Sequence, residues 1–309
     1  MKRVLAAVVL GMLLVLSLGS SMSAAQKSVG IVISTLNNPF FVVLAKNAEK
    51  RAIELGYKPI VLDCQNDPIK EASNVEDLIA QKASIILLNT SEASSAVNSV
   101  KKCNKAGIPV ICLDRAIPGG ESAMFITSDN VAGGRMAGEF LAKKLNYKGN
   151  VVELEGVLGI SATRDRGEGF DSVIAKYPGL KLIAKQTADF DRGKGLQVME
   201  NLIQAHPSID AVFAQNDEMA LGAMRALEAA NLLKKVIVVG YDGIEDALVA
   251  VDSGKMTATI AQRFDELGIK AVEYADKILK GESVPKHVAL DVALVTSDNV
   301  KEYLKAIGK

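Results

Sequence analysis

Short apolar runs rich in β-branched residues alternate with segments of helical period along nearly the whole chain, and this alternation limits the possible folds more than any other feature. The runs are hydrophobic throughout rather than at every second position. Strands of this kind are buried on both faces, as in parallel sheets covered by helices on each side. The sequence therefore predicts an α/β protein with strands at Val29–Ser34, Pro59–Asp63, Ile85–Asn89, Pro109–Leu113, Asn150–Leu154, Lys181–Gln186, Ala211–Ala214, Val236–Tyr241 and Thr257–Ala261.

The order of elements also restarts halfway along the chain. VGIVISTLNNPFF, from Val29, begins one series of strand, loop and helix, and NVVELEGVLGISATRDRGEGF, from Asn150, begins a second. We expect helices between the strands, such as Pro39–Leu55, which Gly56 would end, and Asp217–Ala230. The pattern indicates two doubly wound, Rossmann-like domains with ligand loops at the carboxyl ends of their strands. If those edges face each other, the cleft between the domains is the binding site.

The first 25 residues are typical of a secretory signal peptide. A charged start is followed by an apolar run from Val4 to Leu18 and by small residues that end at Ala25. The run is shorter than the ~20 apolar residues that a membrane-spanning helix needs, so a retained anchor is the less favoured alternative. The segment has no cysteine that could carry a lipid. We expect cleavage after Ala25 and a soluble protein in a bacterial periplasm.

Charge and cysteine content exclude some classes of function. Without its first 25 residues, the chain retains 284 of its 309 residues and carries two more acidic than basic side chains. A nearly neutral chain has no electrostatic reason to bind nucleic acid or an anionic membrane. Cys64, Cys103 and Cys112 allow at most one internal disulfide, and buried thiols are the favoured interpretation. No CxxC or Cys/His cluster indicates zinc, and we expect no metal and no cofactor.

Polar and aromatic side chains follow most of the predicted strands, at the edge where ligand loops are expected. A serine or cysteine nucleophile beside a histidine is absent from this set. Each sugar hydroxyl both donates and accepts, so it suits a carboxylate or amide oxygen beside an arginine or amide N–H. The apolar faces of a sugar ring need flat walls of Phe or Tyr. The set favours a neutral polyol ligand and consists of Asn38, Phe40, Phe41, Asn89, Asp114, Arg115, Arg164, Arg166, Phe190, Asn216, Tyr241, Asp242 and Gln262.

Each of these residues has an alternative structural role when it is taken alone. The adjacent phenylalanines could fill the core at the start of a helix. Asp114 and Arg115 could form a surface ion pair, and Asp217, in AQNDEMA, could cap the next helix. Arg164 and Arg166 could belong to a solvated helix face. Because the same residue classes recur after several strands at one edge, the sequence favours a ligand-binding α/β protein.

Several blocks of the sequence are long and unusual enough to be specific. They are STLNNPFF (34–41), TSDNVAGG (127–134), RDRGEGF (164–170), ADFDR (188–192), AQNDEMALGA (214–223) and ATIAQ (258–262). Together they closely resemble the family of bacterial periplasmic D-ribose-binding proteins, and the likeness extends from Val29 to about Val295. The resemblance implies a substrate-binding component of an ABC-type sugar importer, with the type I periplasmic binding-protein fold.

The resemblance also implies roles for the matching residues. The rings of Phe40, Phe41 and Phe190 would sandwich a pyranose ring, and Asn89 would line the cleft. The residues implied to bind the sugar hydroxyls are Asn38, Asp114, Arg115, Arg166, Asn216, Asp242 and Gln262.

Two domains joined by three crossovers are implied as well, with the crossovers near residues 126–128, 261–262 and 290–292. The N-terminal domain would comprise residues 26–126 and 262–290, and the C-terminal domain residues 127–261 and 291–309. Ribose would close the hinge by contacts to both domains. An inner-membrane permease would bind the surface that the closed form presents. A chemotaxis receptor is a second implied partner.

Three positions depart from the family's usual pattern. Tyr241 stands where the family has phenylalanine and adds a hydroxyl beside the cleft. Thr90 follows Asn89 where a proline is common, and Arg263 adds charge next to the hinge. These departures keep allose and other pentoses as alternatives to D-ribose.

Two other classes of protein are alternatives to a sugar carrier. A sugar-responsive transcription regulator needs an N-terminal helix-turn-helix, and a signal sequence occupies that place here. A sugar-modifying enzyme could use Asp114 and Asp242 as paired carboxylates. Both aspartates have polar neighbours suited to holding hydroxyls, and the resemblance implies no catalysis.

Overall fold

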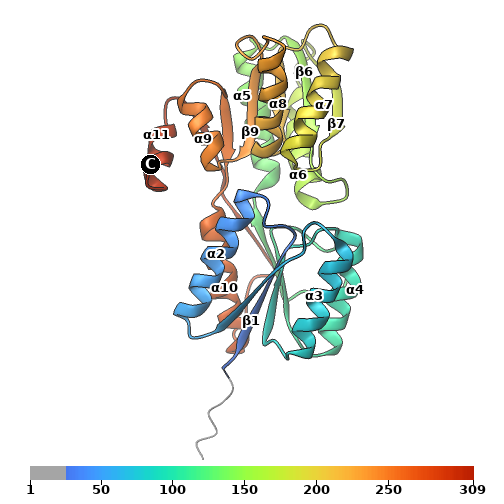
Figure 1. Ribbon diagram of the computed structural model, residues 1–309, viewed down its shortest axis with the longest axis vertical. Helices are drawn as coiled ribbons and strands as arrows, with labels where there is room; N and C mark the ends of the chain where they lie inside the picture. The colour runs from blue at the N-terminus through green and yellow to red at the C-terminus, as the bar shows by residue number, and fades with distance from the viewer. Residues whose placement is uncertain (1–25) are drawn as a thin grey trace, which may run out of the picture.

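The computed structural model describes residues 26–309, and the predicted signal peptide lies outside the described residues. Figure 1 shows two α/β domains stacked along the long axis of the molecule, each built on one six-stranded sheet. The fold class predicted from the sequence is therefore confirmed. Within residues 26–309, no helix is both long and apolar enough to cross a membrane.

The sheet of the first domain is entirely parallel, in the order β11-β5-β4-β3-β1-β2. Its strands are β1 (Ser28–Ile33), β2 (Lys58–Asp63), β3 (Ile85–Leu88), β4 (Val110–Leu113), β5 (Met124–Ser128) and β11 (His287–Leu290). All residues of β3 and β4 are buried, which is why these strands are unbroken apolar runs in the sequence. The helices on this sheet are α2 (Pro39–Glu54), α3 (Pro68–Ala80), α4 (Ala93–Lys105) and α10 (Phe264–Leu279). In Figure 1, α2 and α10 lie together on one side of the sheet, and α3 and α4 on the other.

The sheet of the second domain has the order β12-β10-β9-β8-β6-β7 and is parallel except for β12, which pairs antiparallel with β10. Its strands are β6 (Gly149–Glu155), β7 (Leu180–Thr187), β8 (Ala211–Ala214), β9 (Ile237–Asp242), β10 (Ala258–Ala261) and β12 (Ala293–Thr296). The helices are α5 (Asn130–Lys144), α6 (Ser161–Ile174), α7 (Arg192–Ala205), α8 (Asp217–Ala229), α9 (Glu245–Asp252) and α11 (Val300–Ala306). They pack in pairs, α5 with α6, α7 with α8 and α9 with α11.

Close packing of α5 against α6 fixes the helix that carries Arg166. A Cβ atom on Gly134 would lie 2.0 Å from the backbone oxygen of Arg166, and one on Gly169 would lie 2.1 Å from that of Val131. Only glycine permits this approach of two backbones. The two glycines therefore hold α6 at a defined depth against α5.

The chain crosses between the domains three times. It leaves the first sheet after β5, returns after β10 to form α10, and crosses again in the short segment between β11 and β12. The boundary predicted between residues 126 and 127 falls inside β5.

All nine predicted strands are present, each with its ends within one residue of the prediction. The prediction missed β5, β11 and β12. Each of these strands has only three consecutive apolar residues beside polar ones (MFITS, HVAL and ALVT), and such short runs are a weak strand signal.

Candidate functional site

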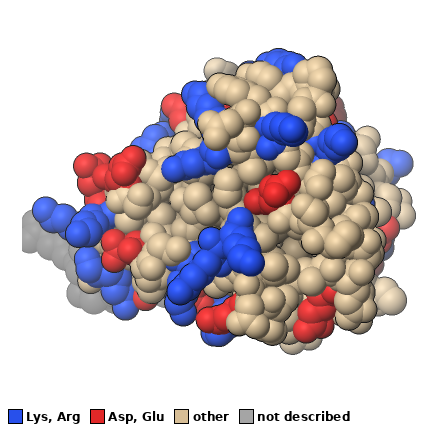
Figure 2. Space-filling model, turned by 90° about the horizontal axis from the view of Figure 1, so that it is seen from above, with Lys and Arg blue, Asp and Glu red and all other residues tan. Residues whose placement is uncertain are grey.

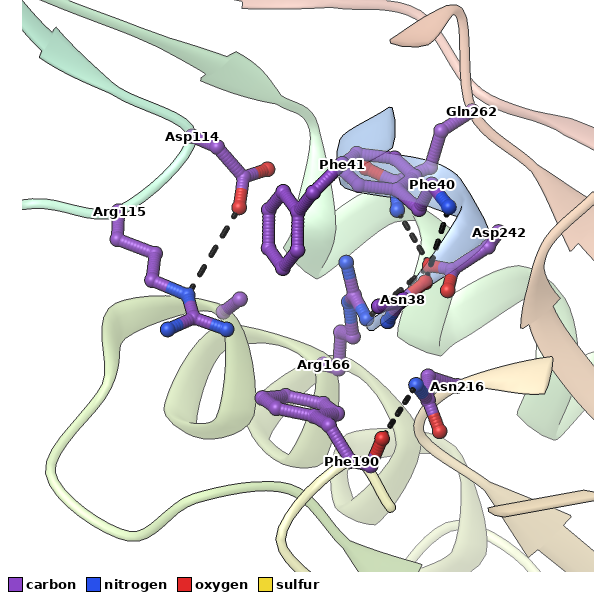
Figure 3. Close-up of a pocket in the computed structure, with 11 residues that line it drawn as sticks. Asn38, Phe40, Phe41, Asp114, Arg115, Arg166, Phe190, Asn216, Asp242 and Gln262 are labelled. Atoms are coloured by element: carbon purple, nitrogen blue, oxygen red, sulfur yellow. Dashed lines mark hydrogen bonds and ion pairs between the residues drawn. The ribbon is translucent and has the colours of Figure 1, made fainter. Parts of the chain in front are cut away.

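A small cavity lies between the two domains, at the carboxyl ends of the parallel strands. Figure 3 shows side chains converging on it from several separate elements. It is lined by Asn38, Phe40, Phe41, Asp114, Arg115, Ala162, Arg166, Phe190, Asn216, Asp242 and Gln262.

Most residues of the set predicted from the sequence thus meet at one place. Ala162, on α6, also lines the cavity, and the sequence analysis missed it. A methyl group carries no chemical signal by which a sequence could mark it.

The two asparagines of the cavity are the N-caps of α2 and α8. Asn38 Oδ1 accepts a hydrogen bond from the backbone N–H of Phe40 at 2.9 Å. Asn216 Oδ1 accepts one from the backbone N–H of Met219 at 2.9 Å. A cap occupies the amide oxygen and leaves the NH₂ group with hydrogens to donate. The site therefore presents amide donors at two helix N-termini.

Two pairs of opposite charge are buried at the cavity, one from each domain. Asp114 Oδ2 lies 3.9 Å from Arg115 Nε, and Asp242 Oδ1 lies 3.6 Å from Arg166 Nη1. Direct charge-assisted hydrogen bonds are shorter, about 2.8 Å, so these groups retain bonding capacity. Asp114 Oδ1 and Gln262 Oε1 are buried and have no hydrogen-bond partner among the described residues. Because a buried acceptor without a partner is unfavourable, donors on a ligand would satisfy both.

Burial opposes the charged state of three groups in this site. It raises the pKa of Asp114 above its ordinary value, and the charges of Arg115 and Arg166 oppose that change. Burial also raises the pKa of Asp242 well above its ordinary value, against the charge of Arg166. The pKa of Arg115 is lowered by burial, against the charge of Asp114. The partner charges offset only part of this cost, and removing one of them leaves another buried charge uncompensated.

Three residues at the cavity have backbone angles in the left-handed region. The φ angle is 65° for Asp114, 129° for Asp242 and 59° for Phe190. Such angles cost a non-glycine residue about 1–3 kcal/mol and persist only where the surroundings fix them. Behind Asp242, the carboxylate of Asp217 accepts hydrogen bonds from the next two backbone N–H groups at 2.7 and 3.0 Å. Strain at three ligand-facing positions supports a preorganised site.

Three phenylalanines provide the apolar walls of the cavity. The rings of Phe40 and Phe41 meet edge to face, with centroids 5.1 Å apart, and come from the first domain, whereas Phe190 comes from the second (Figure 3). The Arg115 guanidinium lies 5.1 Å from the ring centroid of Phe41 and 5.7 Å from that of Phe190. A Cβ atom on Gly156 would lie 1.9 Å from Phe190 Cζ, so glycine leaves the space for this ring. Flat rings from both domains can cover the two apolar faces of a cyclic ligand.

Asn89 and Tyr241 belong to the predicted set but do not line the cavity. Asn89 Oδ1 accepts a hydrogen bond from Ser34 Oγ at 2.7 Å, and its amide reaches Asp114 Oδ2 at 3.4 Å. The Tyr241 ring is fully buried, with its centroid 3.8 Å from the Arg166 guanidinium carbon. Neighbouring residues of a strand point to opposite faces, so Asp242 reaches the cavity and Tyr241 the core. Both residues lie behind those that line the cavity.

The structure also decides the alternative roles considered for other residues. Arg164 is 68% exposed and pairs with Asp165, whereas the Arg166 side chain is only 4% exposed. Asp217 does not cap α8, because Asn216 does. Burial raises the pKa of Asp217 to about 7. The sequence does not reveal that Arg166 is buried while Arg164 is exposed, or that Asp217 is buried. Both facts depend on which surface each helix buries.

The cysteines and the remaining ionisable groups offer no second chemistry at this cavity. Cys64, Cys103 and Cys112 are buried free thiols, as predicted, and burial raises the pKa of Cys64 to about 12. Within residues 26–309, no group of three or more His, Cys, Asp or Glu side chains could hold a metal ion. The site consists of hydrogen-bonding groups and aromatic walls, an arrangement suited to a small polyol.

Comparison with known proteins gives a consistent result. The model of the periplasmic binding protein domain family matches residues 29–283. A ribose import binding protein from Escherichia coli is 51% identical over 276 residues, which cover 89% of this chain and 93% of that protein. A solved ABC transporter solute-binding protein from Bacillus halodurans with bound myo-inositol has a TM-score of 0.85 and 36% identity, covering 90% of this chain and 97% of that one. Another from Actinobacillus succinogenes, with bound D-allose, has a TM-score of 0.83 and 31% identity, covering 90% and 100%.

Proposed function

This chain belongs to the periplasmic binding protein domain family, and from that premise we propose that it captures D-ribose in the interdomain cavity for an ABC-type importer. It is a periplasmic substrate-binding component of a sugar importer and not an enzyme, in agreement with the names of its relatives. The predicted family is thereby confirmed, and so is the predicted role as a substrate-binding component of an ABC-type sugar importer.

The set of residues that line the cavity is the main support for a sugar as the ligand. Two carboxylates, two guanidinium groups and three amides surround a space walled by three phenylalanine rings. Each hydroxyl of a pentose would find an acceptor and a donor there, and the ring would find apolar faces. A closed site of this kind rejects an analogue with one misplaced hydroxyl, because a buried partner is then left without a hydrogen bond.

A calorimetric titration tests the assignment directly. We expect ribose to bind more tightly than allose, arabinose, xylose or galactose. Absence of heat with all five sugars would refute the sugar assignment. Tighter binding of allose than of ribose would change the assigned substrate to allose. The similar structure with bound D-allose is the reason for including this sugar. Recovery of labelled ribose unchanged after incubation would separate a carrier from a sugar-modifying enzyme.

We also propose that ribose closes a hinge formed by the three crossovers. The two domains touch at the cavity rim, where the backbone N–H of Ala116 donates to Ser161 Oγ at 2.9 Å. Arg115 of the first domain also lies against the Phe190 ring of the second. A sugar that contacts both domains only when they are closed shifts the population toward that state.

The closure can be measured by small-angle X-ray scattering. The radius of gyration is expected to fall when ribose is added and to stay constant when a non-binding sugar from the calorimetric panel is added. A radius that does not respond to saturating ribose would contradict closure.

The cellular partners follow from the same proposal. An inner-membrane permease would receive the closed form, and a chemotaxis receptor could read the same face. Residues 1–25 would direct export as a signal peptide. The domains would then divide at the crossovers, close to the boundaries predicted from the sequence.

A further inference from the structure

Each domain contributes one arginine to the cavity, and the same kind of contact holds both. Arg115 Nη1 donates to the backbone carbonyl of Thr90 at 2.7 Å, and Arg166 Nη1 donates to that of Gln215 at 2.6 Å. Thr90 lies just beyond β3, and Gln215 directly follows β8. A carbonyl orients a guanidinium group only if its own loop is held in place. What holds these two loops therefore influences the geometry of the cavity.

In the first domain, the buried carboxylate of Glu71 holds the loop. This residue of α3 is 1% exposed, and its Oε2 accepts a hydrogen bond from the backbone N–H of Ser91 at 2.5 Å. Its Oε1 accepts a second one from Thr90 Oγ1 at 3.0 Å. Burial raises the pKa of Glu71, and the positive charge of Arg115 is among the groups that oppose the change. Glu71 is thus coupled to Arg115 both through the loop and through charge.

In the second domain, Glu153 has the corresponding place. This residue of β6 is fully buried, and its Oε1 accepts a hydrogen bond from Gln215 Nε2 at 2.7 Å. Gln215 Oε1 in turn accepts one from the backbone N–H of Gly156 at 3.0 Å. Gly156 is the residue on which the Phe190 ring rests. Through one glutamine, Glu153 is connected to Arg166 and to the support of an aromatic wall.

We propose that Glu71 and Glu153 are positioning residues for sugar binding, each fixing the carbonyl that orients one arginine of the cavity. The inference rests on the proposed function but concerns residues behind the site, since neither glutamate lines the cavity. Each acts on affinity through a loop and not by touching the sugar.

The chemistry of burial favours this role over simple packing. A buried carboxylate is unfavourable, and apolar side chains of similar volume often replace buried charges without loss of stability. Burial raises the pKa of Glu153 to about 7, although Lys185 Nζ lies 3.1 Å from its Oε2. An acceptor oxygen in a dry interior makes a stronger hydrogen bond than one in water and therefore confines the loop. A positioning role needs this property, whereas space filling does not.

Substitutions at Glu153 separate positioning from stability. In Glu153→Leu, the Gln215 amide loses its acceptor, and we expect ribose affinity to fall about tenfold, as for a buried donor left without its partner. Glu153→Gln keeps an acceptor oxygen and is expected to restore affinity to within about threefold of wild type. The control is Glu139→Gln: Glu139 lies on α5 of the same domain, and its Oε1 lies 3.8 Å from Lys176 Nζ at the surface. Its affinity should equal that of wild type.

Substitutions at Glu71 test the first domain in the same way. Glu71→Leu should lower ribose affinity about tenfold, and Glu71→Gln should recover most of the loss. Glu76→Gln is the control, because Glu76 lies on the same helix and pairs with Lys102 at the surface. Affinities are to be measured well below the unfolding temperature of each variant. Wild-type affinity in either leucine variant, or no recovery with glutamine, would overturn the proposal for that residue.

A second readout does not depend on the sugar. The Arg166 Nε–H group donates to Asn130 Oδ1 at 2.9 Å in a buried setting, so its NMR signal should exchange slowly with water. The variant Arg166→Lys lacks this Nε–H group, so the signal that disappears from its spectrum is the signal of Arg166. In ligand-free Glu153→Leu, we expect the signal to shift or broaden, and in Glu139→Gln to stay unchanged. If wild type bound no sugar, the proposed function would fail, and an unchanged signal in Glu153→Leu would separately refute the positioning role.

Discussion

Replacing Asp114 with alanine is expected to abolish ribose binding detectable by calorimetry while the protein stays folded. The Asp114 carboxylate is buried at the cavity, and its Oδ1 has no partner among the described residues, so a sugar hydroxyl is its natural donor. The substitution also leaves the Arg115 charge without its nearest counter-ion. Truncating one member of a buried charged pair at a binding site costs about 2–5 kcal/mol, or roughly 30- to 5,000-fold in affinity.

Two further variants sharpen this experiment. Asp114→Asn keeps the shape and one acceptor oxygen, so it should retain more affinity than the alanine variant if hydrogen bonding dominates over charge. Asp265→Ala removes an exposed aspartate from the same domain and should bind as wild type does. Near-wild-type affinity in folded Asp114→Ala would show that the cavity is not the ribose site. Circular dichroism and a urea titration check that each variant is folded.

Replacing Arg166 with leucine is expected to remove binding and also to destabilise the protein. The Arg166 side chain is 4% exposed, donates to Asn130 and to the Gln215 carbonyl, and lies beside Asp242. Its loss leaves the Asp242 carboxylate buried without a cation. Breaking a buried pair by removing one partner costs about 3–5 kcal/mol. Urea unfolding should therefore show a lower free energy of unfolding, and calorimetry no ribose heat.

The double variant Arg166→Leu with Asp242→Leu distinguishes an uncompensated charge from lost packing. Since the buried charge is then gone, the double variant should be more stable than Arg166→Leu alone, although it should still not bind ribose. Arg164→Leu is the matched control on the same helix, because its guanidinium is largely exposed. If the double variant were less stable than Arg166→Leu, the unpaired Asp242 carboxylate would not be the cause of the destabilisation. If Arg164→Leu lost ribose binding, the expectation that Arg166 but not Arg164 contributes to binding would be wrong.

The strand pattern was readable in the sequence because burial on both faces leaves an unbroken apolar run. All nine strands predicted on that basis are present. The three missed strands are short, and β11 lies at an edge of its sheet with exposed side chains. An edge strand is defined by its pairing partner more than by its own composition. The residues of β11 alone therefore do not show to which sheet this strand belongs.

The position of the site was also readable, because parallel strands carry their carboxyl ends to one edge. The residues that follow β1, β4 and β8, and the last residue of β9, therefore had to gather there, and residues from each of these places line the cavity. The resemblance to ribose-binding proteins supplied the kind of ligand, which strand order alone could not.

By itself, the sequence determined the α/β class, the two series of strands and the class of side chain at their ends. Only the tertiary structure decided which of those side chains face the cavity. Arg164 and Arg166 are two residues apart on α6, and the docking of α6 on α5 buries one and exposes the other. Tyr241 and Asp242 are neighbours on β9. The Tyr241 side chain is buried in the core, whereas the Asp242 side chain lines the cavity. The buried glutamates behind the arginines were equally invisible, because burial and hydrogen bonding between distant segments depend on packing and not on local composition.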